Sequence, residues 1–418
     1  MKAYLISIGD ELLIGQTINT NVAYIGSALS DINIEVIETS VVGDNMDSIL
    51  QELSKASSMA DLIIITGGLG PTHDDITRSA IVKYFNTELI QSKEVLEDIT
   101  EFFSRRGRKV TELNATQALV PKIATPIRNK RGTAPGIWIE KDNKIFVVMP
   151  GVPFEMKGMM EDFVIPKLSE ITRNNGLVIK KLILQTTGIP ESTLFERLGN
   201  LDELLQGAQI AFLPSQYGVK LRITVKEKNE TDAVNKLNEI EQKIRTKVGR
   251  YIYARGDETL EEVIGKILSD RGLTIAVAES CTGGEVCSRI TNVSGSSKYF
   301  ERGIVTYSNA AKVELLKVNE DTLAEVGAVS MEVAMQMAEG IRAVSGTDIG
   351  ISTTGILGPT GATTNKPVGL VYIGYCDDKV CTAKKFLFGE DRILNKQRAT
   401  QAALEMLRRK LLGISDEE

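Results

Sequence analysis

The stretch from Leu273 to Gly284 reads LTIAVAESCTGG, and it predicts the architecture of the domain around it. Its first half is a short apolar run of small and β-branched residues, which is the pattern of a buried strand. The run ends in a serine, a thiol and two glycines, and helical spacing begins at Glu285. Free backbone N–H groups at such a strand–turn–helix junction can hold a phosphate or an oxyanion. The plainer interpretation is that Ser280 and Thr282 only cap the helix.

Length and composition predict a globular protein with more than one domain. A chain of 418 residues is long for a single core. Its hydrophobic content of 42% and charged content of 25% are ordinary. The net charge of −6 argues against a general nucleic-acid binder. No apolar run is long enough to span a bilayer and the N-terminus lacks a signal-peptide cleavage pattern, so we expect a cytoplasmic protein without a membrane partner.

The cysteines and the single histidine limit the chemistry that is open to the last third of the chain. The four cysteines all lie there: Cys281, Cys287, Cys376 and Cys381. They form no Cys-x-x-Cys pair and have no histidine nearby, which favours reduced thiols over a zinc site. The only histidine is His73, far from Ser280 in sequence, so no Ser-His-Asp triad can be built within this third. A nucleophile there needs lysine, tyrosine or a carboxylate as its base.

Changes in periodicity predict three domains, residues 1–172, 176–253 and 257–414. The first alternates strands and helices, and loops rich in glycine, proline and acidic residues follow three of its strands. These predicted strands are Tyr4–Ile8, Asp61–Thr66 and Lys144–Met149. The pattern is typical of a doubly wound α/β domain with its site at the carboxyl edge of the sheet.

The middle segment changes to alternating strands followed by a charged helix over Thr231–Lys247. This predicts a small α+β module whose topology suggests the KH type. It has no Gly-x-x-Gly loop and no basic face, so no nucleic-acid partner is expected. The third domain opens with Thr259 and Glu262 at the spacing of a capping box, ahead of an amphipathic helix, and continues as a second α/β domain.

Four polar residues of the third domain, Ser280, Tyr307, Lys312 and Thr354, each follow a predicted strand. A serine hydroxyl is a poor nucleophile until a base takes its proton, and Lys312 is the obvious candidate. Its pKa would have to fall from about 10.4 towards neutrality, at a cost of about 4 kcal/mol. Tyr307 could relay the proton or orient the lysine. The alternative is that Lys312 begins an exposed helix and Tyr307 is a half-buried strand residue.

Acidic residues of the first domain, Asp10, Glu11, Asp74 and Asp75, follow two different strands. Carboxylates are hard oxygen ligands that suit Mg²⁺ or Mn²⁺. The loop between them also carries Gly67, Gly68 and Gly70. Such glycines let backbone N–H groups approach a pyrophosphate. The alternative is an acidic turn in which Asp74 or Asp75 caps a helix. The two motifs together favour a metal-assisted phosphate site.

At these motifs the sequence resembles the CinA family of competence/damage-inducible proteins, and the resemblance covers essentially the whole chain. The first-domain matches are Gly9–Gly15 with Asn19–Asn21, Thr66–Thr72 with Asp74–Asp75, and Pro150–Met156. The third-domain matches are Ala278–Gly284, Tyr307–Asn309 with Lys312, Gly327–Ser330, Thr354–Ile356 and Lys366–Gly369. One departure is Gly358–Ala362, where the family more often has consecutive glycines. Ala362 is expected to narrow this loop and to affect the rate more than the reaction.

For the first domain the resemblance implies a molybdopterin-binding-like (MoaB/MogA-like) fold and a metal-dependent ADP-ribose pyrophosphatase. The divalent ion would be magnesium, manganese or cobalt. It would be held by Asp10, Glu11, Asp74 and Asp75. Gly67, Gly68 and Gly70 would contact the substrate. The middle module is similar to the family's KH-type domain, and family members form dimers, which implies a homodimer.

For the last domain the resemblance implies a nicotinamide mononucleotide deamidase that needs no cofactor. The serine of the Glu-Ser-Cys-Thr-Gly-Gly motif is the nucleophile, so Ser280 takes that role, with Lys312 and Tyr307 assisting. Substrate contacts are expected from Thr282, Gly283, Gly284, Thr354 and Gly355. N–H groups of residues 282–284 are candidate oxyanion or phosphate donors. Together the two activities would serve pyridine-nucleotide recycling.

A different class of protein also accounts for these motifs. A non-catalytic molybdopterin- or nucleotide-binding protein with a regulatory or DNA-uptake role would need the same glycine loops and polar strand ends. Such a protein would bind its ligand tightly and would not turn it over. Ammonia release from nicotinamide mononucleotide therefore separates the two hypotheses.

Overall fold

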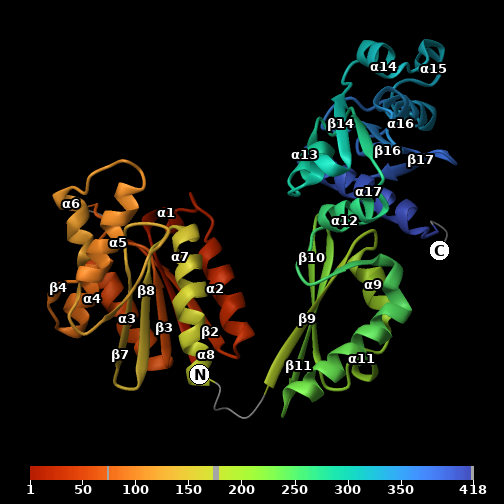
Figure 1. The fold of residues 1–418 in the computed structure, drawn as a ribbon. Helices are drawn as coiled ribbons and strands as arrows, with labels where there is room; N and C mark the ends of the chain where they lie inside the picture. Colours follow the sequence, from red (N-terminus) through yellow and green to blue (C-terminus); the bar gives the residue numbers. More distant parts are fainter. Residues whose placement is uncertain (73–74, 173–177, 416–418) are drawn as a thin grey trace. The chain divides into compact units, whose positions relative to one another are not determined.

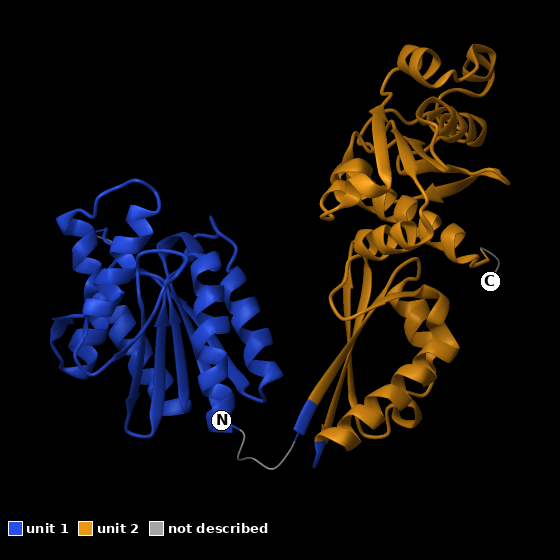
Figure 2. Cartoon of the chain, viewed as in Figure 1, with its two compact units in different colours: residues 1–179, 227–229 blue, residues 180–226, 230–418 orange. Residues whose placement is uncertain are grey.

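The computed structural model describes residues 1–72, 75–172 and 178–415 (Figure 1). The chain divides into two compact units (Figure 2). Unit 1 comprises residues 1–179 and 227–229, and unit 2 comprises residues 180–226 and 230–418. The middle and C-terminal modules therefore lie in one compact unit. Within the described ranges no helix is both long and apolar enough to cross a membrane.

Unit 1 is built on a six-stranded sheet of order β2-β1-β3-β8-β7-β6. Its strands are β1 (Lys2–Ile8), β2 (Glu35–Val42), β3 (Leu62–Thr66), β6 (Thr125–Ile127), β7 (Gly136–Lys141) and β8 (Lys144–Met149), with a separate pair β4 (Leu89–Gln91) and β5 (Leu119–Pro121). The first four strands of the sheet are parallel, and β7 and β6 add antiparallel pairs at one edge. The sheet is therefore mixed, with its antiparallel strands confined to one edge, as in many doubly wound domains.

Helices cover both faces of this sheet (Figure 1). They are α1 (Asp10–Leu13), α2 (Thr20–Asp31), α3 (Met46–Met59), α4 (Thr77–Phe85), α5 (Lys93–Ser104), α6 (Glu112–Ala115), α7 (Pro153–Met159) and α8 (Ile165–Thr172). One core joins the sheet to α3 and α4, and the other joins it to α2, α7 and α8. All five residues of β3 are buried, because a central parallel strand has helices on both sides.

The loops that leave β1, β3 and β8 meet at one edge of the sheet. These three strands are neighbours and run parallel, so their carboxyl ends lie together. Backbone bonds fix the junction: the Gly9 N–H donates to the Val42 carbonyl, and the Gly67 N–H donates to the Met149 carbonyl, both at 3.0 Å. The predicted position of the first-domain loops at the carboxyl edge is confirmed.

The middle module in unit 2 is a four-stranded sheet of order β10-β11-β9-β12 with helices packed against it. Its elements are β9 (Val178–Thr186), α9 (Glu191–Leu198), α10 (Leu201–Leu205), β10 (Gln209–Ser215), β11 (Gly218–Glu227), α11 (Glu230–Val248) and β12 (Ile252–Arg255). Buried Leu237, Ile240 and Ile244 recur on one side of α11 at helical spacing. The predicted charged helix is confirmed, one residue longer at each end.

The C-terminal module is a five-stranded sheet of order β14-β13-β15-β16-β17. Its elements are α12 (Leu260–Arg271), β13 (Ile275–Glu279), α13 (Glu285–Thr291), β14 (Phe300–Val305), α14 (Asn309–Leu316), α15 (Glu320–Val326), α16 (Met331–Ser345), β15 (Ile349–Gly355), β16 (Leu370–Cys376), β17 (Cys381–Leu387) and α17 (Arg392–Leu412). The core with α12, α13 and α17 covers one face, and the core with α14 and α16 covers the other. The predicted capping box of Thr259 and Glu262 begins α12.

The middle and C-terminal modules are joined by hydrogen bonds from α17. The Gln401 amide donates to the Thr187 hydroxyl at 2.9 Å, and the Arg408 guanidinium donates to the Arg250 carbonyl at 2.8 Å. Gln401 and Arg408 are both buried. A buried polar side chain is costly to leave unpaired, so these bonds favour a fixed contact between the two modules.

Candidate active sites

Ser280 and Lys312 form a direct hydrogen bond in the C-terminal module. Ser280 follows β13, and Lys312 lies in the first turn of α14, which itself follows the neighbouring strand β14. The parallel register pairs Glu279 with Val305, so the residues that follow the two strands come together. The Lys312 ammonium donates to Ser280 Oγ at 3.1 Å and to the Thr306 carbonyl at 2.7 Å. The structure therefore places a serine hydroxyl beside a buried amine.

Lys312 is buried, with only 1% of its surface exposed. Burial lowers the pKa of its ammonium from the usual range, because the charged form loses its hydration. A lower pKa increases the neutral fraction that can accept the serine proton. The alternative interpretation, that Lys312 begins an exposed helix, is wrong: α14 is capped by the Ser308 hydroxyl, and its lysine points inward.

Glu279 accepts hydrogen bonds from backbone N–H groups at the start of α13, where a phosphate or an oxyanion was expected to bind. This fully buried carboxylate accepts bonds from the backbone of Gly284 at 2.9 Å, Val286 at 3.2 Å and Cys287 at 2.8 Å. The Gly283 N–H donates back to the Ser280 carbonyl. The start of α13 is thus satisfied from within the protein, because a buried carboxylate needs these donors. The expectation of free donors at Gly283 and Gly284 is corrected.

The glycine turn holds Ser280 in place instead. Gly283 and Gly284 have φ angles of +58° and +96°, a region that side chains disfavour. These angles turn the chain back so that Glu279 can reach the start of α13. The interpretation of Ser280 as a helix cap is also wrong, since α13 has no side-chain cap and Ser280 Oγ instead accepts from Lys312.

Replacing Glu279 with glutamine should lower the free energy of unfolding by about 2–4 kcal/mol. Three backbone N–H groups donate to this carboxylate, and the amide NH₂ of glutamine would face some of them without being able to accept a hydrogen bond. Denaturant unfolding monitored by circular dichroism measures this change. Glu301→Gln, an exposed carboxylate that pairs with its neighbour Arg302, is the control and should change stability much less. Equal stability of Glu279→Gln and the control would contradict an anchoring role.

The threonines expected to contact substrate make internal hydrogen bonds. Thr282 Oγ1 bonds to Thr353 Oγ1 at 2.6 Å, and Thr354 Oγ1 donates to the Ala328 carbonyl at 2.8 Å. All three side chains are buried. The backbone of Gly355 comes so close to β16 that a side chain there would meet the Leu370 carbonyl at 2.6 Å. The hydroxyls of Thr282 and Thr354 are therefore bonded within the protein, and this geometry does not favour contact between them and a substrate.

Tyr307 lies at the surface, away from its expected role beside Lys312. Its side chain is 65% exposed, and its hydroxyl accepts from Arg392 Nη2 at 3.3 Å. The same guanidinium donates to the Gly358 carbonyl at 2.8 Å. The group that orients Lys312 is the Thr306 carbonyl, because the backbone turns inward one residue before Tyr307. Neither Thr306 nor Arg392 was found from the sequence, where neither stands in a recognisable pattern.

Cys281 packs in the core that contains Val286 and Ile290, whereas the hydrogen bond from Lys312 goes to Ser280 Oγ. Burial raises the pKa of its thiol to about 12, so the thiol stays protonated at neutral pH. Adjacent residues leaving a strand face opposite sides, and here the serine faces the lysine. The prediction that Cys281 is a buried thiol is confirmed.

In unit 1, the loops after β1, β3 and β8 surround a cavity of about 550 Å³, called here the glycine-loop cavity. Gly67, Gly68 and Gly70 line it, as expected for the substrate contacts. A side chain at Gly67 would meet the Ile8 carbonyl at 2.1 Å, and one at Gly68 would meet Thr77 Oγ1 at the same distance. Only glycine fits these positions, and the bare backbone leaves room for a ligand.

Four carboxylates among the described residues line the glycine-loop cavity: Glu11, Asp44, Asp75 and Glu155. Asp10, expected as a ligand, is not among them, because its Oδ1 accepts from the Asp44 backbone at 3.2 Å. Asp75 accepts from the Thr72 N–H at 2.9 Å, so it closes a turn and does not cap α4. Asp44 and Glu155 were missed as site residues. In the sequence each is an acidic residue close to a glycine or a proline, a pattern that is common in loops and does not by itself mark a site.

The oxygen donors of this cavity suit a hard divalent cation. Among the described residues, which leave out His73 and Asp74, no three His, Cys, Asp or Glu side chains gather closely enough to hold a metal ion. Two further residues of the lining, Asn21 and Gln117, have amide oxygens that are buried and accept no hydrogen bond from the described parts of the chain. Burial also raises the pKa of Glu155.

Comparisons with known proteins match each part of the chain to a family. Residues 4–170 match the family described as "Probable molybdopterin binding domain". Residues 182–254 match "Damage-inducible protein CinA KH domain", and residues 257–411 match "CinA C-terminal domain". The predicted fold class, a molybdopterin-binding-like domain followed by a KH-type module and a C-terminal α/β domain, is confirmed.

Relatives extend the match to the whole chain. The CinA-like protein of Salinibacter ruber is 45% identical over 414 residues, covering 98% of this chain and 100% of the relative. The CinA-like protein of Kosmotoga olearia is 44% identical, covering 99% and 100%. A solved competence/damage inducible protein from Agrobacterium tumefaciens is 37% identical over 37% of this chain and 93% of its own, with a TM-score of 0.36. The chain described here belongs to the CinA family.

Proposed function

We propose that the C-terminal module deamidates nicotinamide mononucleotide to nicotinate mononucleotide and ammonia. The observation that carries the proposal is the buried Lys312 amine, 3.1 Å from the Ser280 hydroxyl. The module contains no histidine of its own, and Ser280 with Lys312 forms a nucleophile–base pair in direct hydrogen-bond contact at the end of β13. The pair needs no cofactor.

The proposed reaction has two stages. Neutral Lys312 takes the proton of Ser280 while Oγ attacks the carboxamide carbon of the substrate, giving a tetrahedral intermediate. The intermediate collapses, the carbon–nitrogen bond breaks, and the Lys312 ammonium gives its proton to the departing ammonia. Water then attacks the acyl-enzyme, with Lys312 again taking the proton, and releases the carboxylate product and free Ser280. The Thr306 carbonyl positions the lysine throughout.

For unit 1 we propose hydrolysis of ADP-ribose to AMP and ribose 5-phosphate in the glycine-loop cavity. Gly67, Gly68 and Gly70 would let the diphosphate approach the backbone. A divalent ion would take ligands from the carboxylates around this cavity, which include Glu11, Asp44 and Asp75, but no three of the described ones lie close enough to hold it alone, and the expected ligand Asp74 lies outside the described residues. When bound, the ion would supply a water of lowered pKa and neutralise phosphate charge. Glu155, whose pKa is raised by burial, would hold or release a proton near the reacting group.

Incubation with each substrate tests the two proposals separately. Ammonia release from nicotinamide mononucleotide and AMP formation from ADP-ribose are the readouts. Tight binding of either nucleotide without turnover would instead support the alternative, a non-catalytic nucleotide- or molybdopterin-binding protein. That alternative draws on the molybdopterin-binding family matched by residues 4–170.

Metal removal should divide the two activities. EDTA treatment followed by desalting should abolish AMP formation and leave ammonia release within about twofold of its starting value, because the Ser–Lys chemistry uses no metal. Adding back magnesium, manganese or cobalt should restore AMP formation. Loss of ammonia release from a metal-stripped protein with unchanged circular dichroism would overturn the proposed Ser–Lys mechanism.

A further inference from the structure

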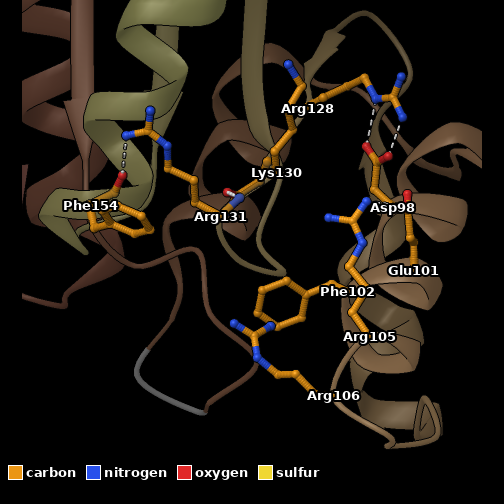
Figure 3. Close-up of a pocket in the computed structure, with 10 residues that line it drawn as sticks. Asp98, Glu101, Phe102, Arg105, Arg106, Arg128, Lys130, Arg131 and Phe154 are labelled. Carbon is orange, nitrogen blue, oxygen red and sulfur yellow. Dashed lines mark hydrogen bonds and ion pairs between the residues drawn. The ribbon is translucent and has the colours of Figure 1, made fainter.

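A second cavity of about 540 Å³ in unit 1 carries a surplus of positive charge (Figure 3). Its cationic lining residues are Arg105, Arg106, Arg128, Lys130 and Arg131. Its acidic lining residues are Asp98 and Glu101. Lys130 and Arg131 also pair with Asp162 and Glu161, which lie outside the lining, so five cations face four carboxylates and the formal surplus is one, in a chain whose net charge is −6. We call this the arginine cavity. Its charge favours an anionic ligand.

Two aromatic rings face the arginine cavity, and each carries a guanidinium group. Phe102 and Arg106 come from α5 and its C-terminal end, and the guanidinium carbon lies 3.6 Å from the ring centroid. Phe154 and Arg131 approach from the other side, 5.0 Å apart by the same measure (Figure 3). Phe154 is 65% exposed. Aromatic faces and guanidinium planes are the surfaces on which nucleobases stack.

The cations of the arginine cavity differ in how firmly they are held. Arg128 forms a two-pronged ion pair with Asp98, which is largely buried. Arg105 pairs with Glu101 at an exposed position, where such a pair contributes little. Arg106 has no carboxylate within 4.0 Å among the residues that the structure describes, so its N–H edge is available to a phosphate.

The buried side chain of Asn129 connects the lining of the arginine cavity to that of the glycine-loop cavity. Asn129 lines the arginine cavity, and its amide donates to Glu155 Oε2 at 2.6 Å and to the Ala134 carbonyl at 2.9 Å. Glu155 and Ala134 both line the glycine-loop cavity. Phe154 lies between Pro153 and Glu155 of that same lining. A ligand longer than one nucleotide could therefore occupy both cavities.

We infer that the arginine cavity binds the nucleoside monophosphate end of a diphosphate-linked substrate whose second phosphate lies in the glycine-loop cavity. The inference rests on the hydrolysis proposed above for unit 1. The base stacks on Phe154 or Phe102, and Arg106 and Arg131 neutralise the phosphate nearest to the nucleoside. The remaining sugar phosphate makes no contact with the arginine cavity. Binding at this end fixes which half of the substrate leaves as the nucleoside monophosphate.

Two variants test this inference, each with a matched control in unit 2. Phe154→Ala and Arg106→Gln should each raise the KM for ADP-ribose about tenfold or more and weaken inhibition by AMP to the same extent, with kcat within about twofold. Inhibition by ribose 5-phosphate should not change. Phe195→Ala, a phenylalanine that is 54% exposed against 65% for Phe154, and Arg302→Gln should leave all these values unchanged. Emission from Trp138, the single tryptophan and part of the unit 1 core, reports whether the two unit 1 variants are folded, and circular dichroism does so for the controls.

Calorimetry of AMP with the full chain separates this inference from the proposed hydrolysis. If the wild-type protein does not cleave ADP-ribose, the hydrolysis proposal fails, and weaker AMP binding by Phe154→Ala than by Phe195→Ala still supports the cavity assignment. Unchanged AMP affinity in both folded variants, or no AMP binding by the wild type, would overturn it. So would tighter binding of a single-stranded oligonucleotide than of AMP, which would assign the cavity to nucleic acid.

Discussion

Ser280→Ala is expected to lower the rate of ammonia release from nicotinamide mononucleotide by about 10⁴-fold or more, because it removes the atom that forms the acyl-enzyme. Substrate binding should persist, since the hydroxyl is one small group in the site. Single-turnover ammonia assays and equilibrium binding of the nucleotide measure the two effects separately. The folded state should be little affected, because alanine fits the space of a serine.

Cys281→Ala is the matched control for Ser280→Ala, because it changes the adjacent residue by a similar volume. Its thiol has a pKa raised to about 12, so only about one thiol in 10⁵ is ionised at pH 7. We expect a modest loss of stability, at most a small loss of rate, and slow or no inactivation by alkylating reagents. Substantial turnover by Ser280→Ala, with Cys281→Ala folded but inactive, would reverse the assignment.

Lys312→Met is expected to lower ammonia release by about 10²–10⁴-fold, the usual contribution of a general base. Methionine keeps the length and the apolar contacts of the buried side chain, so the variant should fold. Lys312→Arg keeps a positive charge that cannot be lost near neutral pH, and it should be impaired to a similar degree. A variant of either kind that retained more than about a tenth of the wild-type rate would exclude Lys312 as the base.

The pH dependence follows from the direction of the Lys312 pKa shift. Burial lowers this pKa, and the base is the neutral amine, so the rate should rise with pH and level off above the folded-state pKa, below about 10.4. The folded state disfavours the ammonium, so wild-type stability relative to Lys312→Met should fall as pH drops from about 10.4 to the folded-state pKa and then stay constant. Rate profiles and denaturant midpoints across this range test both statements.

Much of the fold could be predicted from periodicity, because buried strands and long amphipathic helices carry strong local patterns. The bounds of β8 agree with the prediction, and α11 extends its predicted range by one residue at each end. The segment between Thr77 and Lys144 received no prediction. Its strands β4, β5 and β6 are only three residues long, too short to show a period, but the patterns of α4, α5 and β7 were also missed. The arginine cavity draws most of its lining from this segment.

Residue types were enough to propose Ser280 and Lys312 and to exclude a histidine triad, since the chain has one histidine and it lies in the first domain. They were also enough to place Gly67 and Gly68 in a phosphate-type loop, because only glycine permits so close a backbone approach. These conclusions depend on the side-chain chemistry and the backbone freedom of each residue type, which can be read directly from the sequence.

The pairing of those residues was decided only by the tertiary structure. The parallel register of β13 with β14 brings Ser280 to Lys312, turns the Thr306 carbonyl inward and leaves Tyr307 exposed. Likewise Glu279 takes the N–H groups of α13 because the two positive-φ glycines fold the turn back onto it. The sequence determined which groups were present. Burial and strand register, which act between residues distant along the chain, decided which of them meet and how readily Lys312 gives up its proton.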